Sequence, residues 1–345
     1  MKSFFDYTRS EVARYLGRPA RATRLYKAVY QDRLGSLSKS DRPAAEHFDL
    51  SLPPVVNRFE SADGTRRYLL RLQDGEVVES VLIPEGQRFT FCISSQIGCA
   101  LACKFCLTGQ LGLIRNLSAA EIVSQVLVLR AEISRERSDR FSVVLMGMGE
   151  PLQNYENVIK AIQILADDHG VALPLRRITL STAGLLPGIE RLVKERLFPN
   201  LSISLSGATN ESRDELMPIN RKYPIEDVIG AVRRLSGSRR KRVMFEYVMI
   251  KGVTDSPDDA QHLSALLRGL GAKVNLIPLN ESPDIDFQRS ERSRILRFQQ
   301  VLIRSGISTF IRKTRGDDVY GACGQLKKNG YALDGADSHN LQPQH

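Results

Sequence analysis

The chain has 345 residues, of which 42% are hydrophobic, enough to bury one large core or two smaller ones. It carries 49 Lys and Arg against 39 Asp and Glu, and this net charge of +10 favours RNA or DNA as a partner over an anionic membrane. No apolar run follows the first residues, and no stretch approaches the roughly 18 apolar residues of a membrane span, so we expect a cytoplasmic protein with no membrane partner.

Residues 1–50 predict a small helical unit, which we expect to be an RNA-binding accessory domain. Apolar residues recur at helical spacing from Arg18 to Leu34, and four of the cations in this stretch lie beside them. The solvated face of an ordinary amphipathic helix explains these cations by itself better than a nucleic-acid contact does. The four cations are Arg21, Arg24, Lys27 and Arg33.

Residues 51–88 predict a β-hairpin that connects this unit to the rest of the chain. Pro53 and Pro54 end the helical pattern. Two short strand candidates, Arg67–Leu72 and Val77–Ile83, flank a turn at Asp74-Gly75.

Residues 89–327 alternate between strand and helix with a period of about 30 residues. This α/β pattern predicts parallel strands with crossover helices, closed fully or partly into a barrel whose function lies at the carboxyl ends of its strands. Helix start signals occur at Ser118 and Ser256. The strand candidates are Phe89–Ile93, Phe141–Leu145, Ile178–Leu180, Leu201–Leu205, Val243–Ile250, Val274–Ile277 and Ser308–Ile311. The other helix candidates are Asn154–Asp168, Ile225–Leu235 and Ser290–Arg304. The polar residues 328–345 predict a flexible tail.

Three cysteines, Cys99, Cys103 and Cys106, follow the first of these strands in a C-x₃-C-x₂-C pattern. Three thiolates can hold three irons of a [4Fe–4S] cluster and leave the fourth iron open to a substrate group. This spacing is typical of radical S-adenosylmethionine (SAM) enzymes, whose open iron binds the methionine end of SAM. Two alternatives remain: one face of a buried helix, and a zinc site that needs a fourth ligand.

Small polar residues and glycines follow the other strands and are candidates for binding SAM. Gly149 and Glu150 end the second strand, where glycine permits close approach of a ligand but tight packing explains it about as often. The other candidates, each of which could also be a turn or capping residue, are Ser181, Ser204, Leu205, Ser206 and Asn280.

Two further cysteines lie outside this pattern. Cys92 is in a strand candidate, and Cys323 lies in a Gly-Ala-Cys-Gly segment that offers little apolar cover and so favours an accessible thiol. Simple packing explains either one alone, but together they form a possible redox pair.

These motifs together resemble the radical-SAM 23S rRNA adenine-C2 methyltransferases over roughly residues 10 to 326. The paired outlying cysteines make the resemblance specific. The segments that carry it are Cys92–Cys99, the cysteine triad, Arg115–Leu117, Gly147–Pro151, Met217–Asn220, Arg312–Asp318 and Ala322–Leu326.

The resemblance implies a partial (βα)₆ TIM-type barrel, a [4Fe–4S] cluster, SAM and an RNA substrate, either 23S rRNA or tRNA. Adenine carbon 2 is electron-poor and cannot attack a methyl group, so the family uses a radical route. One SAM methylates Cys323, a second is cleaved at the cluster, and the activated methyl group of Cys323 adds to the adenine. Glu79 is then the implied proton acceptor, and Cys92 resolves the adduct through a transient disulfide with Cys323.

The chain departs from the family at Ser206, where a histidine is usual; serine keeps a hydrogen-bonding group but has no imidazole. A related resistance enzyme methylates adenine carbon 8, and Pro151 after Glu150 favours carbon 2 here. The run of cations at 239–242 is a candidate phosphate contact or a solvated linker. The family also implies a flavodoxin-type electron donor.

Two other hypotheses for the function are a non-catalytic RNA-binding protein with a structural metal and a radical-SAM activase that acts on another protein.

Overall fold

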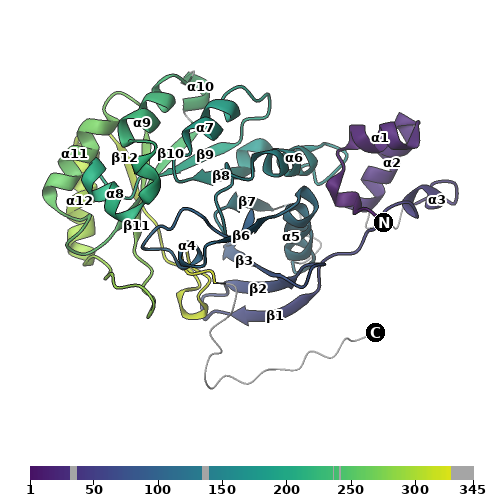
Figure 1. The fold of residues 1–345 in the computed structure, drawn as a ribbon, viewed down its shortest axis with the longest axis horizontal. Helices are drawn as coiled ribbons and strands as arrows, with labels where there is room; N and C mark the ends of the chain where they lie inside the picture. Colours follow the sequence, from purple (N-terminus) through teal and green to yellow (C-terminus); the bar gives the residue numbers. More distant parts are fainter. Residues whose placement is uncertain (32–36, 134–139, 236, 241, 328–345) are drawn as a thin grey trace.

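A computed structural model describes residues 1–31, 37–133, 140–235, 237–240 and 242–327. One ten-stranded sheet forms the centre of the molecule, and its strands follow the order of the chain from β1 at one edge to β12 at the other (Figure 1). Its strands are β1 (Val55–Glu60), β2 (Arg66–Arg71), β3 (Val77–Glu85), β4 (Arg88–Cys92), β7 (Phe141–Leu145), β8 (Ile178–Thr182), β9 (Asn200–Ser204), β10 (Val243–Met249), β11 (Lys273–Pro278) and β12 (Ser308–Ile311).

From β4 through β7 to β12 each strand is parallel to the next, as the alternating pattern predicts. All seven strand candidates of this region are confirmed, each within two residues of its expected bounds. The expected partial barrel is therefore confirmed, with helices over the outer side of the strands (Figure 1). These helices are α5 (Ala119–Ala131), α6 (Tyr155–Ala166), α7 (Leu186–Leu192), α8 (Asn210–Leu216), α9 (Ile225–Arg233), α10 (Gly237–Arg240), α11 (Pro257–Leu267) and α12 (Arg292–Arg304).

The two expected helix starts form complete capping boxes. The Ser118 side chain accepts a hydrogen bond from the Glu121 backbone N–H, and the Glu121 carboxylate accepts one from Ser118. Ser256 and Asp259 do the same at the start of α11. Each box satisfies backbone N–H groups that the first turn of a helix leaves unpaired.

The connecting hairpin is also confirmed, because β2 pairs with β3 in antiparallel register across the Asp74-Gly75 turn. Strand β1, which the sequence did not predict, extends it by one strand, and β3 pairs with β4. The hairpin strands therefore continue the barrel sheet instead of forming a separate layer (Figure 1).

The N-terminal helices α1 (Arg9–Leu16) and α2 (Pro19–Tyr30) lie beside the end of α6, and α3 (Arg42–Ala45) lies further out (Figure 1). The expected helix from Arg18 is confirmed as α2, and residues 32–34 of that expectation lie outside the described residues. Two of its cations, Arg21 and Arg24, pair with Asp41. These two charges are therefore used within the unit.

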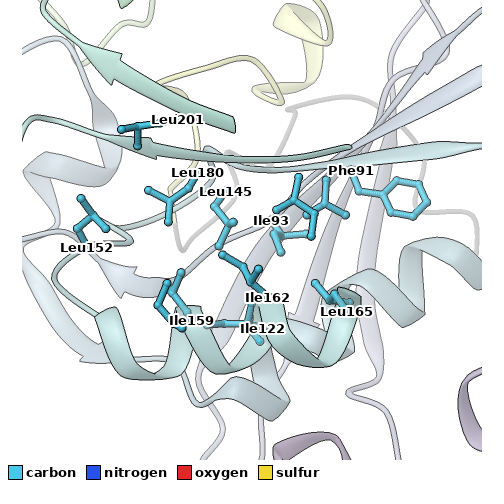
Figure 2. Close-up of a cluster of buried hydrophobic side chains, with 14 of the residues drawn as sticks. Phe91, Ile93, Ile122, Leu145, Leu152, Ile159, Ile162, Leu165, Leu180 and Leu201 are labelled. Carbon is cyan, nitrogen blue, oxygen red and sulfur yellow. The ribbon is translucent and has the colours of Figure 1, made fainter. Parts of the chain in front are cut away.

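The main hydrophobic core runs through the N-terminal helices, the hairpin and the barrel. It joins Phe4 and Tyr26 of the N-terminal helices to Tyr68 and Val78 of the hairpin and to the barrel. Figure 2 shows its central part, where Ile122 of α5 and Ile159, Ile162 and Leu165 of α6 face side chains of the sheet such as Phe91, Leu145 and Leu180. The proposed domain boundaries at 50 and 88 remain a prediction, and the expected tail at 328–345 lies outside the described residues. In the part of the chain that the structure describes, none of the helices combines the length and apolar character needed to span a bilayer.

Candidate active site

A cavity lies at the carboxyl ends of the parallel strands, where the alternating fold places function. The three cysteines of the triad line it together with Cys323. So do nearly all of the residues proposed to bind SAM, namely Gly149, Glu150, Ser181, Ser204, Ser206 and Asn280. Leu205 is the exception: it is fully buried and is not among the lining residues.

The triad lies in a loop and not on a helix, so the helix-face alternative is wrong. The loop is framed by a short antiparallel hairpin of β5 (Gln96–Gly98) and β6 (Leu113–Asn116) and leads into the short helix α4 (Leu107–Gln110). The Cys99 backbone N–H donates to the Gly112 carbonyl at 2.8 Å, and the Leu107 N–H donates to the Gly324 carbonyl at 2.8 Å. The second bond ties the triad loop to the segment that carries Cys323.

Gly98 is required at the base of this loop for two reasons. Its φ is +74°, and a Cβ there would overlap the Gly112 carbonyl oxygen. Gly112 has a similar φ of +68°, but a Cβ there would meet nothing within 4 Å.

We therefore expect Gly98→Ala to lower the free energy of unfolding by more than the about 1–3 kcal/mol that backbone strain alone would cost. It should also reduce the amount of bound iron. Gly112→Ala, which suffers only that strain, is the matched control in denaturant unfolding and iron analysis. Equal losses in the two variants would show that the overlap is unimportant.

The triad thiols suit an iron–sulfur cluster, whose core is cationic. Burial raises the pKa of Cys99 to about 12 and raises that of Cys103 and Cys106, and the neighbouring thiolates raise the Cys99 and Cys103 values further. Thiolates at such positions need a metal centre to stabilise their charge. Among the described residues, no group of three His, Cys, Asp or Glu side chains is placed to hold a single metal ion. A four-iron cluster takes each thiolate on a separate iron, so its ligands need not converge on one point.

Glu150 links the ends of two strands at the cavity wall. Its carboxylate accepts hydrogen bonds from the backbone N–H of Leu152 at 3.0 Å and of Ala183 at 2.8 Å. Burial raises the pKa of Glu150 to about 7, although these two bonds oppose the shift. The carboxylate is therefore held rigidly and retains lone pairs toward the cavity.

Two polar atoms of the cavity wall lack partners among the described residues: the Ser206 hydroxyl and the Asn280 side-chain oxygen. Ser206 is fully buried at a φ of +50°, and the Asn280 amide donates to the Cys323 carbonyl at 2.9 Å. Unpaired buried polar groups are costly unless a ligand or water satisfies them. The wall therefore fits a polar nucleoside-bearing cofactor such as SAM.

The glycines at the end of β7 serve packing. A Cβ on Gly147 would lie 2.8 Å from the Ile93 carbonyl oxygen, and one on Gly149 would lie 2.5 Å from the Gln96 Cβ. Neighbouring protein atoms therefore suffice to exclude a side chain at both positions.

Arg213, which the sequence did not single out, joins the loops behind the cavity. Its fully buried guanidinium donates to the Ser204 and Leu205 carbonyls at 3.3 and 3.0 Å, and also to the Ala183 carbonyl. Burial lowers the pKa of Arg213 to about 10. The side chain fixes the ends of β8 and β9 relative to each other.

Cys323 lines a second cavity as well, which it shares with Cys92 and Arg312. Arg312 donates to Glu246 at 3.4 Å, and Glu246 lines the first cavity. Burial raises the pKa of Cys92 to about 12, whereas the Arg312 charge lowers it. All five cysteines are free thiols in this structure, so the disulfide between Cys92 and Cys323 is not formed in it.

Glu79 on β3 is fully buried and is not among the residues that line either cavity. It accepts hydrogen bonds from Arg67 at 3.3 Å and from the Lys327 backbone N–H at 3.2 Å. Burial raises the pKa of Glu79 to about 7, and Arg67 opposes the shift. The carboxylate thus lies beside the segment that follows Cys323.

The cations at 239–242 precede β10, at the end of the barrel opposite the cavities. Arg239 donates to the Val193 and Glu195 carbonyls, and Arg242 donates to the Phe198 carbonyl. These two side chains are thus used inside the fold. Lys241 and the Arg240 side chain lie outside what the structure describes.

Comparison with known proteins confirms the resemblance. Residues 93–263 match the Radical SAM superfamily model. The dual-specificity RNA methyltransferase RlmN of Syntrophobacter fumaroxidans is 45% identical over 332 residues, covering 93% of this chain and 96% of that protein. The RlmN protein of Paracoccus denitrificans is 48% identical over 295 residues, or 82% of this chain and 75% of that protein. The crystal structure of a radical SAM methyltransferase from Sphaerobacter thermophilus, 40% identical, superposes with a TM-score of 0.89 over 95% of this chain and 100% of that one. The chain therefore belongs to the RlmN family of radical-SAM RNA methyltransferases.

Proposed function

We propose that this protein methylates carbon 2 of an adenine in 23S rRNA, with tRNA as a second substrate class, through a methyl group carried on Cys323. The observation that carries the proposal is the position of Cys323, which lines the cavity of the triad and also the cavity of Cys92. A methyl carrier needs this placement, because it must be reached by the cofactor on one side and by the resolving thiol on the other.

A [4Fe–4S] cluster and SAM are the cofactors of this enzyme class. Cys99, Cys103 and Cys106 would hold the cluster, and the strand-end residues of the first cavity would hold SAM. When bound, the two together supply an organic radical that abstracts hydrogen. We propose as SAM contacts Gly149, Glu150, Ser181, Ser204, Leu205, Ser206 and Asn280, with Leu205 limited to its backbone or to packing.

The chain's own residues would carry the later steps. The methyl carbon on Cys323, once it has lost a hydrogen atom, would bond to adenine carbon 2. The adduct would then give up one electron, which the cluster would accept, and the proton on carbon 2 must leave. Glu79 is the proposed acceptor, since a carboxylate with a pKa of about 7 is suited to a general base near neutral pH. The Cys92 thiolate then attacks the Cys323 sulfur, and the bond from that sulfur to the methylene carbon breaks with its electron pair staying on the carbon. The carbon takes up a proton to become the methyl group, so the methylated base is released and a Cys92–Cys323 disulfide remains.

One feature of the sequence favours carbon 2 over carbon 8. Pro151 follows Glu150, as in the carbon-2 enzymes.

Cleavage of SAM and reduction of the disulfide both consume electrons. We propose a flavodoxin-type donor for the cleavage of SAM. Ser206 in place of the usual histidine supplies a hydroxyl to the cofactor wall.

The test is analysis of product RNA. Anaerobically reconstituted protein is incubated with SAM, a reductant and RNA, and the RNA is digested to nucleosides and compared with 2-methyl- and 8-methyladenosine standards. We expect 2-methyladenosine. 8-Methyladenosine would instead support the resistance-type enzyme, and RNA without any methyladenosine would contradict the proposal and favour a protein substrate or a binding role.

A further inference from the structure

The second cavity is bordered by the segment that follows β12. Arg312, Lys313 and Arg315 line it, against one carboxylate, Glu85. Cys92 and Cys323, the two thiols outside the triad, line the same cavity. Three cations thus lie around the place where the methyl carrier meets the resolving thiol.

The three cations differ in how far their charge is already neutralised. Arg315 pairs with Asp63 at 3.6 Å, and Arg312 pairs with Glu246 at 3.4 Å. Lys313 is exposed and makes no ion pair with any residue in the described ranges. The side-chain hydrogen bonds of Arg312 use only Nη1, which leaves the donors on Nε and Nη2 without a partner among the described residues.

The surface beyond Arg315 has the opposite charge. Asp63, Asp317 and Asp318 line a neighbouring open cavity together with Glu281. An anion that approached from this side would be repelled, so the region favourable to a negative ligand is restricted to Arg312 and Lys313. This restriction favours one discrete contact over diffuse attraction.

We propose that this second cavity binds a phosphodiester group of the RNA strand next to the target adenine, with Lys313 as the principal contact and Arg312 as the second. The inference rests on the proposed function and adds to it the site of backbone recognition. A phosphate held at the rim would place the attached nucleoside toward Cys92 and Cys323. Contacts to phosphate position a nucleic acid, whereas the base itself is selected deeper in the site.

The test is the salt dependence of RNA binding. Fluorescence anisotropy is recorded for a labelled RNA hairpin with one unpaired adenosine, at several KCl concentrations, with the full-length reconstituted protein. Lys313→Gln is compared with the wild type and with Lys273→Gln. Lys273 is a matched control because it is also exposed and begins β11, at the opposite end of the barrel.

We expect Lys313→Gln to weaken binding severalfold and to reduce the slope of log K against log salt by about 0.7, the value for one phosphate contact to a single strand. Lys273→Gln should match the wild type in both quantities. Methylation of Cys323, followed by protein mass spectrometry, should be unchanged in Lys313→Gln, because that step needs only the first cavity. Wild-type affinity and slope in Lys313→Gln would overturn the proposal.

The outcome separates this inference from the proposed function. If the wild type methylates adenine and Lys313→Gln binds RNA as the wild type does, the phosphate site is wrong and the proposed function stands. If the wild type yields no methyladenosine but Lys313→Gln still lowers RNA affinity and slope, the proposed function fails and the phosphate site stands.

Discussion

Replacement of Cys323 by alanine is expected to reduce methyladenosine formation by at least about a thousandfold, as when other covalent nucleophiles are removed. The reason is that carbon 2 of adenine is electron-poor and has no direct route to the methyl group of SAM. Without the thiol that borders both cavities, no methyl group can be delivered to the base. The measurement is mass spectrometry of nucleosides from RNA treated with the anaerobically reconstituted variant.

Cys92→Ala is the matched control, because it removes the other thiol of the second cavity. It should also stop turnover, but only after the methyl group has reached Cys323, so its protein should carry a methylated Cys323 or a covalent RNA adduct. Cys323→Ala should carry neither. Methylated RNA from Cys323→Ala at the wild-type rate would show that Cys323 is not the carrier.

Replacement of Arg67 by methionine is expected to lower the free energy of unfolding by about 3–5 kcal/mol at pH 8. The side chains of Arg67 and Glu79 are 2% and 0% exposed and lie 3.3 Å apart, so the variant leaves a buried carboxylate without its cation. Burial raises the folded-state pKa of Glu79 to about 7, and loss of Arg67 should raise it further. When a carboxyl has a raised folded-state pKa, the free energy of unfolding of the protein falls as the pH rises through that pKa. The destabilisation caused by Arg67→Met should therefore be smaller at pH 5 than at pH 8.

The double variant Arg67→Met/Glu79→Gln should recover part of this loss, because no buried charge remains. Arg234→Met, which breaks an exposed pair with Glu190, should cost no more than about 1 kcal/mol. Equal losses of unfolding free energy for Arg67→Met and Arg234→Met in urea unfolding would contradict the account.

The single variant Glu79→Gln also tests the proposed role of Glu79 as proton acceptor. If this variant is stable and still methylates RNA, that role is excluded.

The barrel was predictable because its strands are short buried runs between turn signals. Val243–Met249 and Lys273–Pro278 are buried almost throughout, and such runs are visible in one sequence. Strand β1 was missed because its residues are almost all exposed, so no alternation marks it. The short strands β5 and β6 were missed because their pairing depends on the positive φ of Gly98 and on a register shift there.

Site residues were predictable when their spacing in the sequence indicates their chemistry. They were not predictable when their role depends on how the fold buries them. The cysteine triad and Cys323 stand out in the sequence, and the structure brings them to one cavity. Arg213 is an ordinary cation in the sequence; only the fold shows that it holds carbonyl groups of two strand ends. Likewise, the run at 239–242 resembles a phosphate site until Arg239 and Arg242 are seen to bind backbone carbonyls within the fold.

The central claim, a cluster held by three thiolates with one iron open to SAM, is tested most directly by metal analysis combined with electron paramagnetic resonance of the reduced protein. We predict about four irons per chain and a cluster spectrum that changes when SAM is added, with both lost when Cys99, Cys103 and Cys106 are replaced by alanine. Tetrahedral zinc, or a cluster spectrum that SAM leaves unchanged, would contradict the account.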